Sequence, residues 1–346
     1  MTKGAGETTA TKATSPAKSG GKANKHALVT EPVAVDSHCV GDRWTVEDED
    51  RLARLIAVIA MGQASHAAQI IVELRPAEAA ISDKALKEAA KLQLSITGTT
   101  ANEQDASRWR RDGFIFEVIS WIAARQTVGA DVLMKAPHLK STTQGIDGLM
   151  VELNAEKSEV IQATIFEDKC SESPRTMFRD QIMPAFADHH ANKRAPELVA
   201  VASELIEKAG LDGSAATAAA ARILDKKFRR YRAALAVLPT DDTKARREAL
   251  FKNYDDLKDM KQTQRVGVSF ITKEGHRIHR CNSGWDDLMF DPVTAKILQA
   301  APPLEGLNPE SLPALLTRQY AQLVARRLRG IDTKERNLWV QAKPGL

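Results

Sequence analysis

The stretch that decides the fold lies in the middle of the chain, over residues 144–169. It reads QGIDGLMVEL over residues 144–153 and, after a polar turn, EVIQATIFEDK over residues 159–169. Short apolar runs separated by a polar turn are typical of two antiparallel strands. The sequence therefore predicts a strand hairpin here, with one acid at the start of the first strand and two acids and a lysine at the end of the second.

The charged residues of this hairpin fall into a pattern that suggests chemistry. Side chains alternate between the faces of a strand, so Glu167 and Lys169 share one face while Asp168 points to the other. Asp147 opens the neighbouring strand and is expected to approach the same cation as Glu167. Two carboxylates suit a hard ion such as Mg²⁺, or Mn²⁺ in its place. Lys169 would orient or deprotonate a water, or stabilise developing charge, so the pattern predicts phosphodiester cleavage.

A further acid, Glu117, interrupts the apolar part of a helix predicted over residues 102–126. A carboxylate in such a place lies at the edge of the apolar stripe or has a partner. Two interpretations stay open: an edge residue in a surface salt bridge, or an acid directed at the same metal site. In the second interpretation Glu117 joins Asp147 and Glu167 as a metal ligand and serves a second ion.

The arrangement of Asp147, Glu167 and Lys169 resembles the PD-(D/E)xK nuclease superfamily. The resemblance covers residues 111–186, roughly a fifth of the chain, together with the strand that begins at Val266. It implies a restriction-endonuclease-like fold, in which a small mixed sheet is flanked by helices. It also implies metal-dependent nuclease activity.

Four residues of the chain match positions of the family motif. Asp147 matches the first acid of the family, Glu167 the second, Lys169 the lysine, and Glu117 the helix acid that many members place upstream. The chain departs from the family at Ile146, which stands where the motif has proline. The resemblance thus implies catalytic roles for these four charged residues.

Three polar residues that follow the hairpin are candidates for contacts to a nucleic acid. Arg175, Arg179 and Gln181 come soon after Lys169, and this nearness indicates contacts to phosphate groups. The alternative is an ordinary helix surface.

A denser basic run lies over residues 226–232, within a helix predicted over residues 215–238. On that helix Lys227 and Arg230 would align and track a phosphate backbone. The alternative is a solvated helix face that is balanced by nearby acids. The net charge of +4 and the pI near 8.8 are compatible with a nucleic acid partner.

The helical and strand patterns together predict an α/β (mixed α+β) fold. We expect a small mixed central sheet flanked by helices, a restriction-endonuclease-like core with large helical additions. The predicted parts are a disordered basic tail (1–26), an N-terminal helical region (27–100), the nuclease core (101–195), a helical insertion (196–262), and a C-terminal strand pair with helices that completes the core (263–346).

Several classes of protein are disfavoured by the sequence. Three cysteines far apart argue against a disulfide framework and for a reducing compartment. Apolar runs stay well short of the roughly 20 residues of a membrane helix, and the start lacks the apolar core of a secretory signal. We therefore expect a cytoplasmic protein without a membrane partner. The GxxxxGK[ST], GxGxxG and GxSxG motifs are absent, which argues against nucleotide-driven work and serine hydrolysis.

Two hypotheses of function follow. The first is a Mg²⁺- or Mn²⁺-dependent nuclease that acts on nucleic acid, with DNA favoured over RNA. By the resemblance, it would serve restriction, repair or anti-phage defence, with a helicase or sensor protein as partner and a homo-oligomer as one form. The alternative is a non-catalytic helical adaptor that binds nucleic acid or protein, with the hairpin as a structural salt-bridge site.

Overall fold

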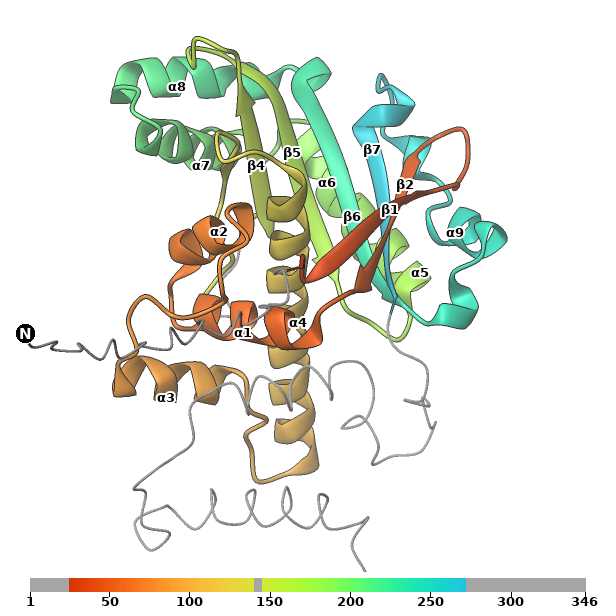
Figure 1. Cartoon of the computed structure of the whole chain (residues 1–346). Coiled ribbons are helices and arrows are strands. Elements are labelled where there is room, and N and C mark those ends of the chain that lie inside the picture. The colour runs from red at the N-terminus through yellow and green to blue at the C-terminus, as the bar shows by residue number, and fades with distance from the viewer. Residues whose placement is uncertain (1–24, 140–144, 272–346) are drawn as a thin grey trace, which may run out of the picture. The chain divides into compact units, whose positions relative to one another are not determined.

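The computed structural model describes residues 25–139 and 145–271 of the chain. At their centre lies a seven-stranded mixed sheet in the order β1-β2-β7-β6-β5-β4-β3 (Figure 1). The strands are β1 Leu28–Val33, β2 Val40–Val46, β3 Leu133–Met134, β4 Gly148–Leu153, β5 Val160–Lys169, β6 Arg229–Val237 and β7 Arg265–Ile271. The predicted mixed α/β class is confirmed, and the predicted hairpin is the β4–β5 pair.

Strand β5 is where antiparallel and parallel parts of the sheet meet. It pairs antiparallel with β4, where Gly148 lies opposite Phe166, and parallel with β6. The parallel order continues through β7 to β2, and the antiparallel pairs β1–β2 and β3–β4 form the two edges. Parallel strands buried on both faces need apolar side chains almost throughout, which explains the long apolar runs of β5, β6 and β7.

One face of the sheet carries the helices α1 Glu49–Ala60, α2 Ala64–Val72 and α4 Ala101–Thr127, and α3 Lys84–Gln93 packs on α1. Asp48 caps α1, and Thr100 with Glu103 forms a capping box at the start of α4. Helix α4 contacts β1 and β5, and its Phe116 ring lies 5.9 Å from that of Phe270 on β7. The long helix predicted over residues 102–126 is thereby confirmed, and it runs directly beside the hairpin.

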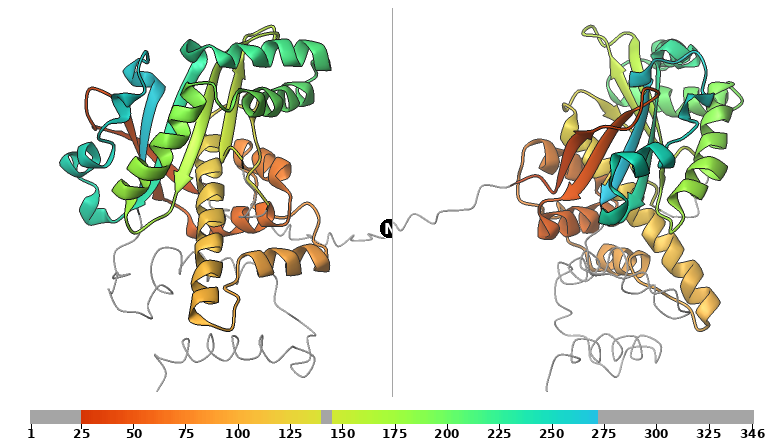
Figure 2. Two further views of the ribbon diagram at one scale, coloured as in Figure 1. Left: turned by 180° about the vertical axis from the view of Figure 1, so that it is seen from behind. Right: turned by 90° about the vertical axis from the view of Figure 1, so that its right-hand side faces the viewer.

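The other face is covered by α5 Pro174–Met177, a π-helical turn at Phe178–Ile182, α6 Met183–His190, α7 Ala195–Lys208, α8 Gly213–Ala221 and α9 Lys244–Leu250. Figure 2 shows the green helices α5 and α6 on the opposite side of the sheet from the orange helices α1 to α3. The aromatic rings of Phe178, Phe186, Tyr231 and Tyr254 pack together in this second core. The sheet therefore separates two apolar cores.

The predicted helical insertion over residues 196–262 is wrong in its second half, because residues 229–237 form the central strand β6. The alanines of this segment predict a helix, since alanine has the highest helix propensity. Both faces of β6 are buried, and Tyr231, Ala233 and Leu235 contribute to one core while Ala234 and Ala236 contribute to the other. Tertiary burial overrides the local propensity here. Short 3₁₀ turns connect the elements around it, at Arg222–Leu224, Lys226–Phe228, Pro239–Asp241, Tyr254–Asp256 and Gln262–Gln264.

The N-terminal region predicted as helical over residues 27–100 also needs correction. Its first part forms the strands β1 and β2, and β2 pairs with β7 more than 200 residues later in the chain. The three helices that follow agree with the prediction. The predicted strand that begins at Val266 is confirmed as β7, whereas its predicted partner strand, the C-terminal helices and most of the N-terminal tail lie outside the described residues.

Gly148 allows the two strands of the hairpin to approach closely. A Cβ atom at this position would overlap the ring of Phe166, which is buried and has the Arg232 guanidinium 3.5 Å from its centroid. We expect Gly148→Ala to lower the free energy of unfolding by about 1–3 kcal/mol, as overpacking does. Urea denaturation measures this change.

The matched control is Gly113→Ala in helix α4. An added Cβ there meets nothing within 4 Å, and alanine is the better helix former. We expect Gly113→Ala to raise the free energy of unfolding by about 0.5–1 kcal/mol. If Gly148→Ala were as stable as the native protein, the close packing of the hairpin described above would be wrong.

Candidate active site

The hairpin brings Asp147, Glu167 and Lys169 together at one end of strands β4 and β5. Since Gly148 pairs with Phe166, the preceding residue Asp147 faces Glu167 across the antiparallel pair. Lys169 lies two residues beyond Glu167 and shares its face of the sheet. The three groups therefore come from neighbouring positions of a rigid element.

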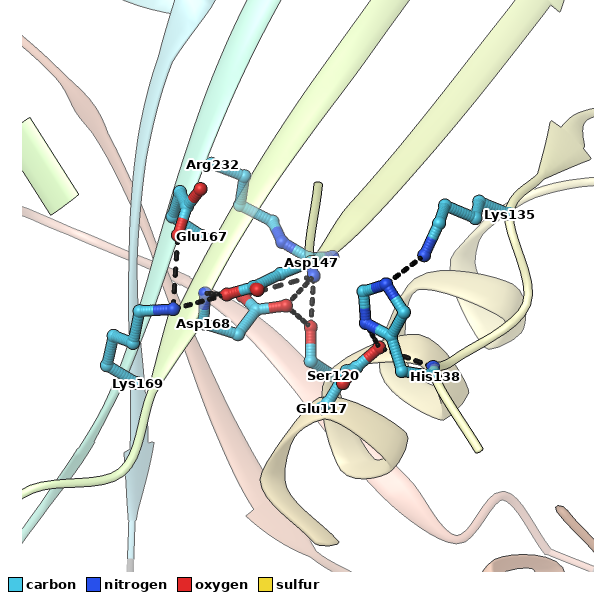
Figure 3. Close-up of polar contacts among 9 residues, drawn as sticks. All are labelled: Glu117, Ser120, Lys135, His138, Asp147, Glu167, Asp168, Lys169 and Arg232. Atoms are coloured by element: carbon cyan, nitrogen blue, oxygen red, sulfur yellow. Dashed lines mark hydrogen bonds and ion pairs between the residues drawn. The ribbon is translucent and has the colours of Figure 1, made fainter. Parts of the chain in front are cut away.

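The Lys169 ammonium connects both carboxylates (Figure 3). Its Nζ atom lies 2.5 Å from Oδ2 of Asp147 and 3.2 Å from Oε2 of Glu167. The side chains of Lys169 and Asp147 are 27% and 23% exposed, whereas that of Glu167 is only 6% exposed. The cluster is thus open to solvent on one side and buried on the other, as a site for a substrate requires.

Two carboxylates share one ammonium here, and this crowding perturbs the titration of Glu167. Burial, and then the negative charge of Asp147, raise the pKa of Glu167 to about 8, although Lys169 acts in the opposite direction. Burial alone would lower the pKa of Lys169, but the attraction of both carboxylates outweighs it and raises that pKa. The site therefore holds more negative charge than its lysine neutralises at a pH above about 8.

Asp168 lies on the other face, as strand alternation predicts, and belongs to a buried polar network. Ser120 of α4 donates a hydrogen bond of 2.5 Å to Oδ2 of Asp168, and Nη2 of Arg232 lies 3.3 Å from the same atom and also contacts Ser120. Burial raises the pKa of Asp168 to about 6. The backbone N–H of Asp168 donates to Oδ2 of Asp147 at 3.4 Å, which links this network to the cluster.

Glu117 pairs with His138, a partner that the sequence did not indicate. Its Oε1 atom accepts a hydrogen bond of 2.8 Å from the backbone N–H of His138 and lies 3.1 Å from Nδ1 of the same histidine. The Nε2 atom of His138 in turn lies 2.9 Å from Nζ of Lys135. Glu117 therefore has a local partner, as in the first of the two interpretations left open by the sequence, and it does not contact Asp147 or Glu167.

Sequence reasoning overlooked Lys135 and His138, which lie beside the cluster in Figure 3. In the short apolar run over residues 130–136, only Leu133–Met134 pair as β3. The signal that could have identified Lys135 is a lysine near the end of a short apolar run. His138 carried no such signal, because the chain between Pro137 and Asp147 has no strand pattern.

The residues predicted to contact phosphate groups are mostly engaged elsewhere. Nη1 of Arg175 donates to the backbone carbonyls of Leu250 and Lys252, at 3.0 and 2.7 Å, so this arginine ties α5 to the end of α9. Its predicted contact with a phosphate group stays a prediction. Arg179 is exposed and pairs with Asp180, and Gln181 is exposed.

The predicted basic helix face does not exist, because its two residues lie on different elements. Lys227 is in the 3₁₀ turn Lys226–Phe228 and pairs with Asp225 at 2.7 Å. Arg230 is half-buried in β6. The run that looked like a surface for a phosphate backbone is in large part the start of a buried strand.

Within the described part of the chain, no group of three or more His, Cys, Asp and Glu side chains is placed to hold a metal ion. Asp147 and Glu167 supply a pair of carboxylates, which is a donor set that suits a hard divalent cation. The raised pKa of Glu167 gives a physical reason for such a cation, since added positive charge would relieve the repulsion between the two acids. The residues present therefore fit Mg²⁺ or Mn²⁺ with two protein ligands.

Comparisons of the chain with protein-family models, with curated proteins and with solved structures return no match. Among the described residues, none of the helices combines the length and the apolar character needed to cross a membrane. The function proposed below rests on the side chains of the cluster and on their geometry.

Proposed function

We propose that the protein is a metal-dependent nuclease that hydrolyses phosphodiester bonds, with DNA as its substrate. One observation carries the proposal: two carboxylates from neighbouring strands lie within 2.5 and 3.2 Å of one amine, at a point that is partly open to solvent. Asp147 and Glu167 would hold the cation, and Lys169 would face the phosphate. The seven-stranded mixed sheet with helices on both faces supports the resemblance to the restriction-endonuclease-like nucleases.

The roles of the residues follow from their charge and burial. A bound divalent cation supplies a coordinated water of lowered pKa and offsets the charge that develops on the phosphate. Lys169 holds its proton firmly, because its pKa is raised, so it acts by stabilising negative charge and not as a base. Its ammonium is held between Asp147 and Glu167, which orients it before the substrate arrives.

Cleavage of supercoiled plasmid DNA tests the proposal. We expect the native chain to nick or linearise the plasmid with Mg²⁺ or Mn²⁺ and to lose this activity with EDTA or with Asp147→Asn. The alternative, a non-catalytic adaptor in which the same three residues form a structural salt bridge, predicts no cleavage under any of these conditions. Cleavage that persists in Asp147→Asn would reject this site as its source.

Glu167→Gln tests the crowding of the two acids without reference to activity. Because the pKa of Glu167 is raised from 4.5 to about 8, its carboxyl destabilises the fold: the penalty is absent below about pH 4.5 and complete above about pH 8. Without divalent ions, we expect Glu167→Gln to unfold like the native protein at pH 5. At pH 8.5 its free energy of unfolding should be higher by roughly 2 kcal/mol, measured by urea denaturation.

Glu152→Gln is the matched control, since Glu152 lies on β4 in the same hairpin and accepts a hydrogen bond of 2.8 Å from Gln162. It should show no such dependence on pH. Added Mn²⁺ should raise the melting temperature of the native protein and of Glu152→Gln, but not that of Glu167→Gln, because binding to the folded state stabilises it. If Glu167→Gln were less stable than the native protein at pH 8.5, the unfavourable burial of the Glu167 carboxylate beside Asp147 would be wrong.

A further inference from the structure

Three side chains beside the carboxylate cluster form a continuous row of polar contacts. The row runs from Glu117 of α4 through His138 to Lys135, which follows β3, with 3.1 Å between Oε1 of Glu117 and Nδ1 of His138 and 2.9 Å between Nε2 of His138 and Nζ of Lys135. The side chains of Glu117 and His138 are only 15% and 12% exposed. In the view of Figure 3 the row lies on one side of Asp147, and Lys169 lies on the other.

The strand register directs Lys135 toward the cluster. The backbone N–H of Lys135 donates to the carbonyl of Leu149 at 2.8 Å, so the β3–β4 pairing continues one residue beyond Met134. Lys135 therefore shares a face of the sheet with Leu149 and, two residues earlier, with Asp147. The Lys135 ammonium thus approaches the site from the strand opposite to the one that carries Lys169.

The row has a defined direction. Glu117 accepts from the backbone N–H of His138 at 2.8 Å and faces its Nδ1 atom, so the proton of the neutral ring belongs on Nδ1. The lone pair of Nε2 is then turned to the Lys135 ammonium, which donates to it. Glu117 fixes the imidazole, and the imidazole fixes the amine.

The charges around Lys135 act on it in both directions. Burial lowers its pKa, and four carboxylates oppose this effect, in the order Glu117, Asp147, Glu197 and Glu204. The last two lie on α7, where Arg194 and Lys208 pair with them. Lys135 is therefore a half-buried cation whose pKa is lowered by burial, and among the carboxylates Glu117 opposes this effect most.

We propose that Lys135 is a second catalytic lysine, which contacts the scissile phosphate from the side opposite Lys169 and gives its proton to the leaving oxygen. His138 and Glu117 are its positioning residues. This role rests on the proposed nuclease function. In the step, the oxygen of one water forms a bond to phosphorus and releases a proton to solvent. The bond from phosphorus to the leaving oxygen breaks, that oxygen takes a proton from Lys135, and the amine regains one from solvent.

A comparison of leaving groups tests this role. The leaving sugar oxygen of DNA needs a proton, whereas the p-nitrophenolate of a p-nitrophenyl phosphodiester leaves without one. We expect Lys135→Met to lower kcat on DNA about a hundredfold but to lower kcat on the p-nitrophenyl ester less than about threefold. Lys169→Met should lower both, since it acts on the phosphate itself.

The pH profile separates positioning from a purely structural contact. A general acid must hold its proton, so cleavage of DNA falls as pH rises through the pKa of Lys135. Glu117→Gln removes the carboxylate that does most to keep that proton in place, and the basic limb of the profile should move to lower pH. If the row of Glu117, His138 and Lys135 only held the chain against α4, Glu117→Gln would change the melting temperature and leave the basic limb of the pH profile where it is.

The outcomes distinguish this inference from the proposed function. If the native protein cleaves neither DNA nor the ester, the nuclease proposal fails. If the native protein cleaves both and Lys135→Met loses activity equally on the two substrates, or on neither, only the role of Lys135 is overturned. A circular dichroism melt of each variant confirms that the chain is folded, and Lys135→Arg, which keeps the charge but holds its proton more tightly, should remain impaired on DNA.

Discussion

Replacing Lys169 by methionine is expected to lower the rate of DNA cleavage by about a hundredfold to a thousandfold while the chain stays folded. Removal of one preorganised charge that faces the transition state has an effect of this size. Methionine keeps the length of the side chain, and the ammonium it replaces lies 2.5 Å from Asp147 and 3.2 Å from Glu167. The pKa of Glu167 is already raised to about 8, and loss of the ammonium would raise it further, so Glu167 stays protonated at neutral pH and the cost to stability is limited.

Single-turnover cleavage of plasmid DNA with saturating Mn²⁺ measures the loss. The matched control is Lys193→Met, because Lys193 is exposed at the end of α6 and pairs with Asp188 at 2.8 Å. It should cleave like the native protein. A Lys169→Met variant with unchanged activity would remove this lysine from the catalytic machinery, and a variant that fails to fold would show instead that the ion pairs are structural.

The sequence predicts the cluster of Asp147, Glu167 and Lys169, because its members lie close together in the chain. An apolar run that ends in Glu167 and Lys169 fixes both the strand and the face that these side chains share. The antiparallel pairing of β4 with β5 then places Asp147 opposite Glu167. These contacts involve residues about 20 positions apart, and the strand period is sufficient to predict them.

The partner of Glu117 could not be predicted in the same way. Its position in the apolar part of α4 showed that it needed a partner, but several acids and bases nearby in sequence were equally compatible. The contact with His138 depends on the path of the chain after β3, which carries no periodic pattern. Lys135 becomes part of the site only once the β3–β4 register is known.

The basic run over residues 226–232 illustrates a second limit. From sequence, Arg229 and Arg232 resembled a surface that binds phosphate groups, yet both are buried. Arg229 donates to the carbonyls of Ile223 and His189, and Arg232 lies beside Asp168. An arginine that satisfies a buried carbonyl or carboxylate looks the same in sequence as one on the surface, because only tertiary packing separates them.

The same packing gives the largest expected change in stability, for Arg232→Met. This guanidinium lies 3.3 Å from Asp168, and its centre is 3.5 Å from the Phe166 ring and 5.0 Å from the Trp44 ring. Methionine fills much of the same space between the rings but leaves the Asp168 carboxylate buried without a cation. Breaking a buried pair in this way costs about 3–5 kcal/mol. We expect that loss in the free energy of unfolding at pH 8, measured with urea.

The dependence on pH identifies the cause of this loss. The pKa of Asp168 already lies at about 6, above its ordinary 3.8, so this carboxyl destabilises the fold increasingly as pH rises between those values. Without Arg232 the pKa rises further, and the penalty extends to higher pH. The difference between Arg232→Met and the native protein should therefore shrink at pH 5, where Asp168 takes up a proton. A loss of equal size at both pH values would show that packing against the rings, and not the charge of Asp168, is what Arg232 supplies.

Asp168→Asn in the Arg232→Met background completes the argument. It removes the unpaired charge while an amide can still accept the hydrogen bond from Ser120, so the double variant should be more stable at pH 8 than Arg232→Met alone. Arg179→Met is the exposed control, because Arg179 pairs with Asp180 at the surface, and it should change stability by less than about 1 kcal/mol. A double variant no more stable than Arg232→Met would mean that Asp168 is not held as an anion by Arg232.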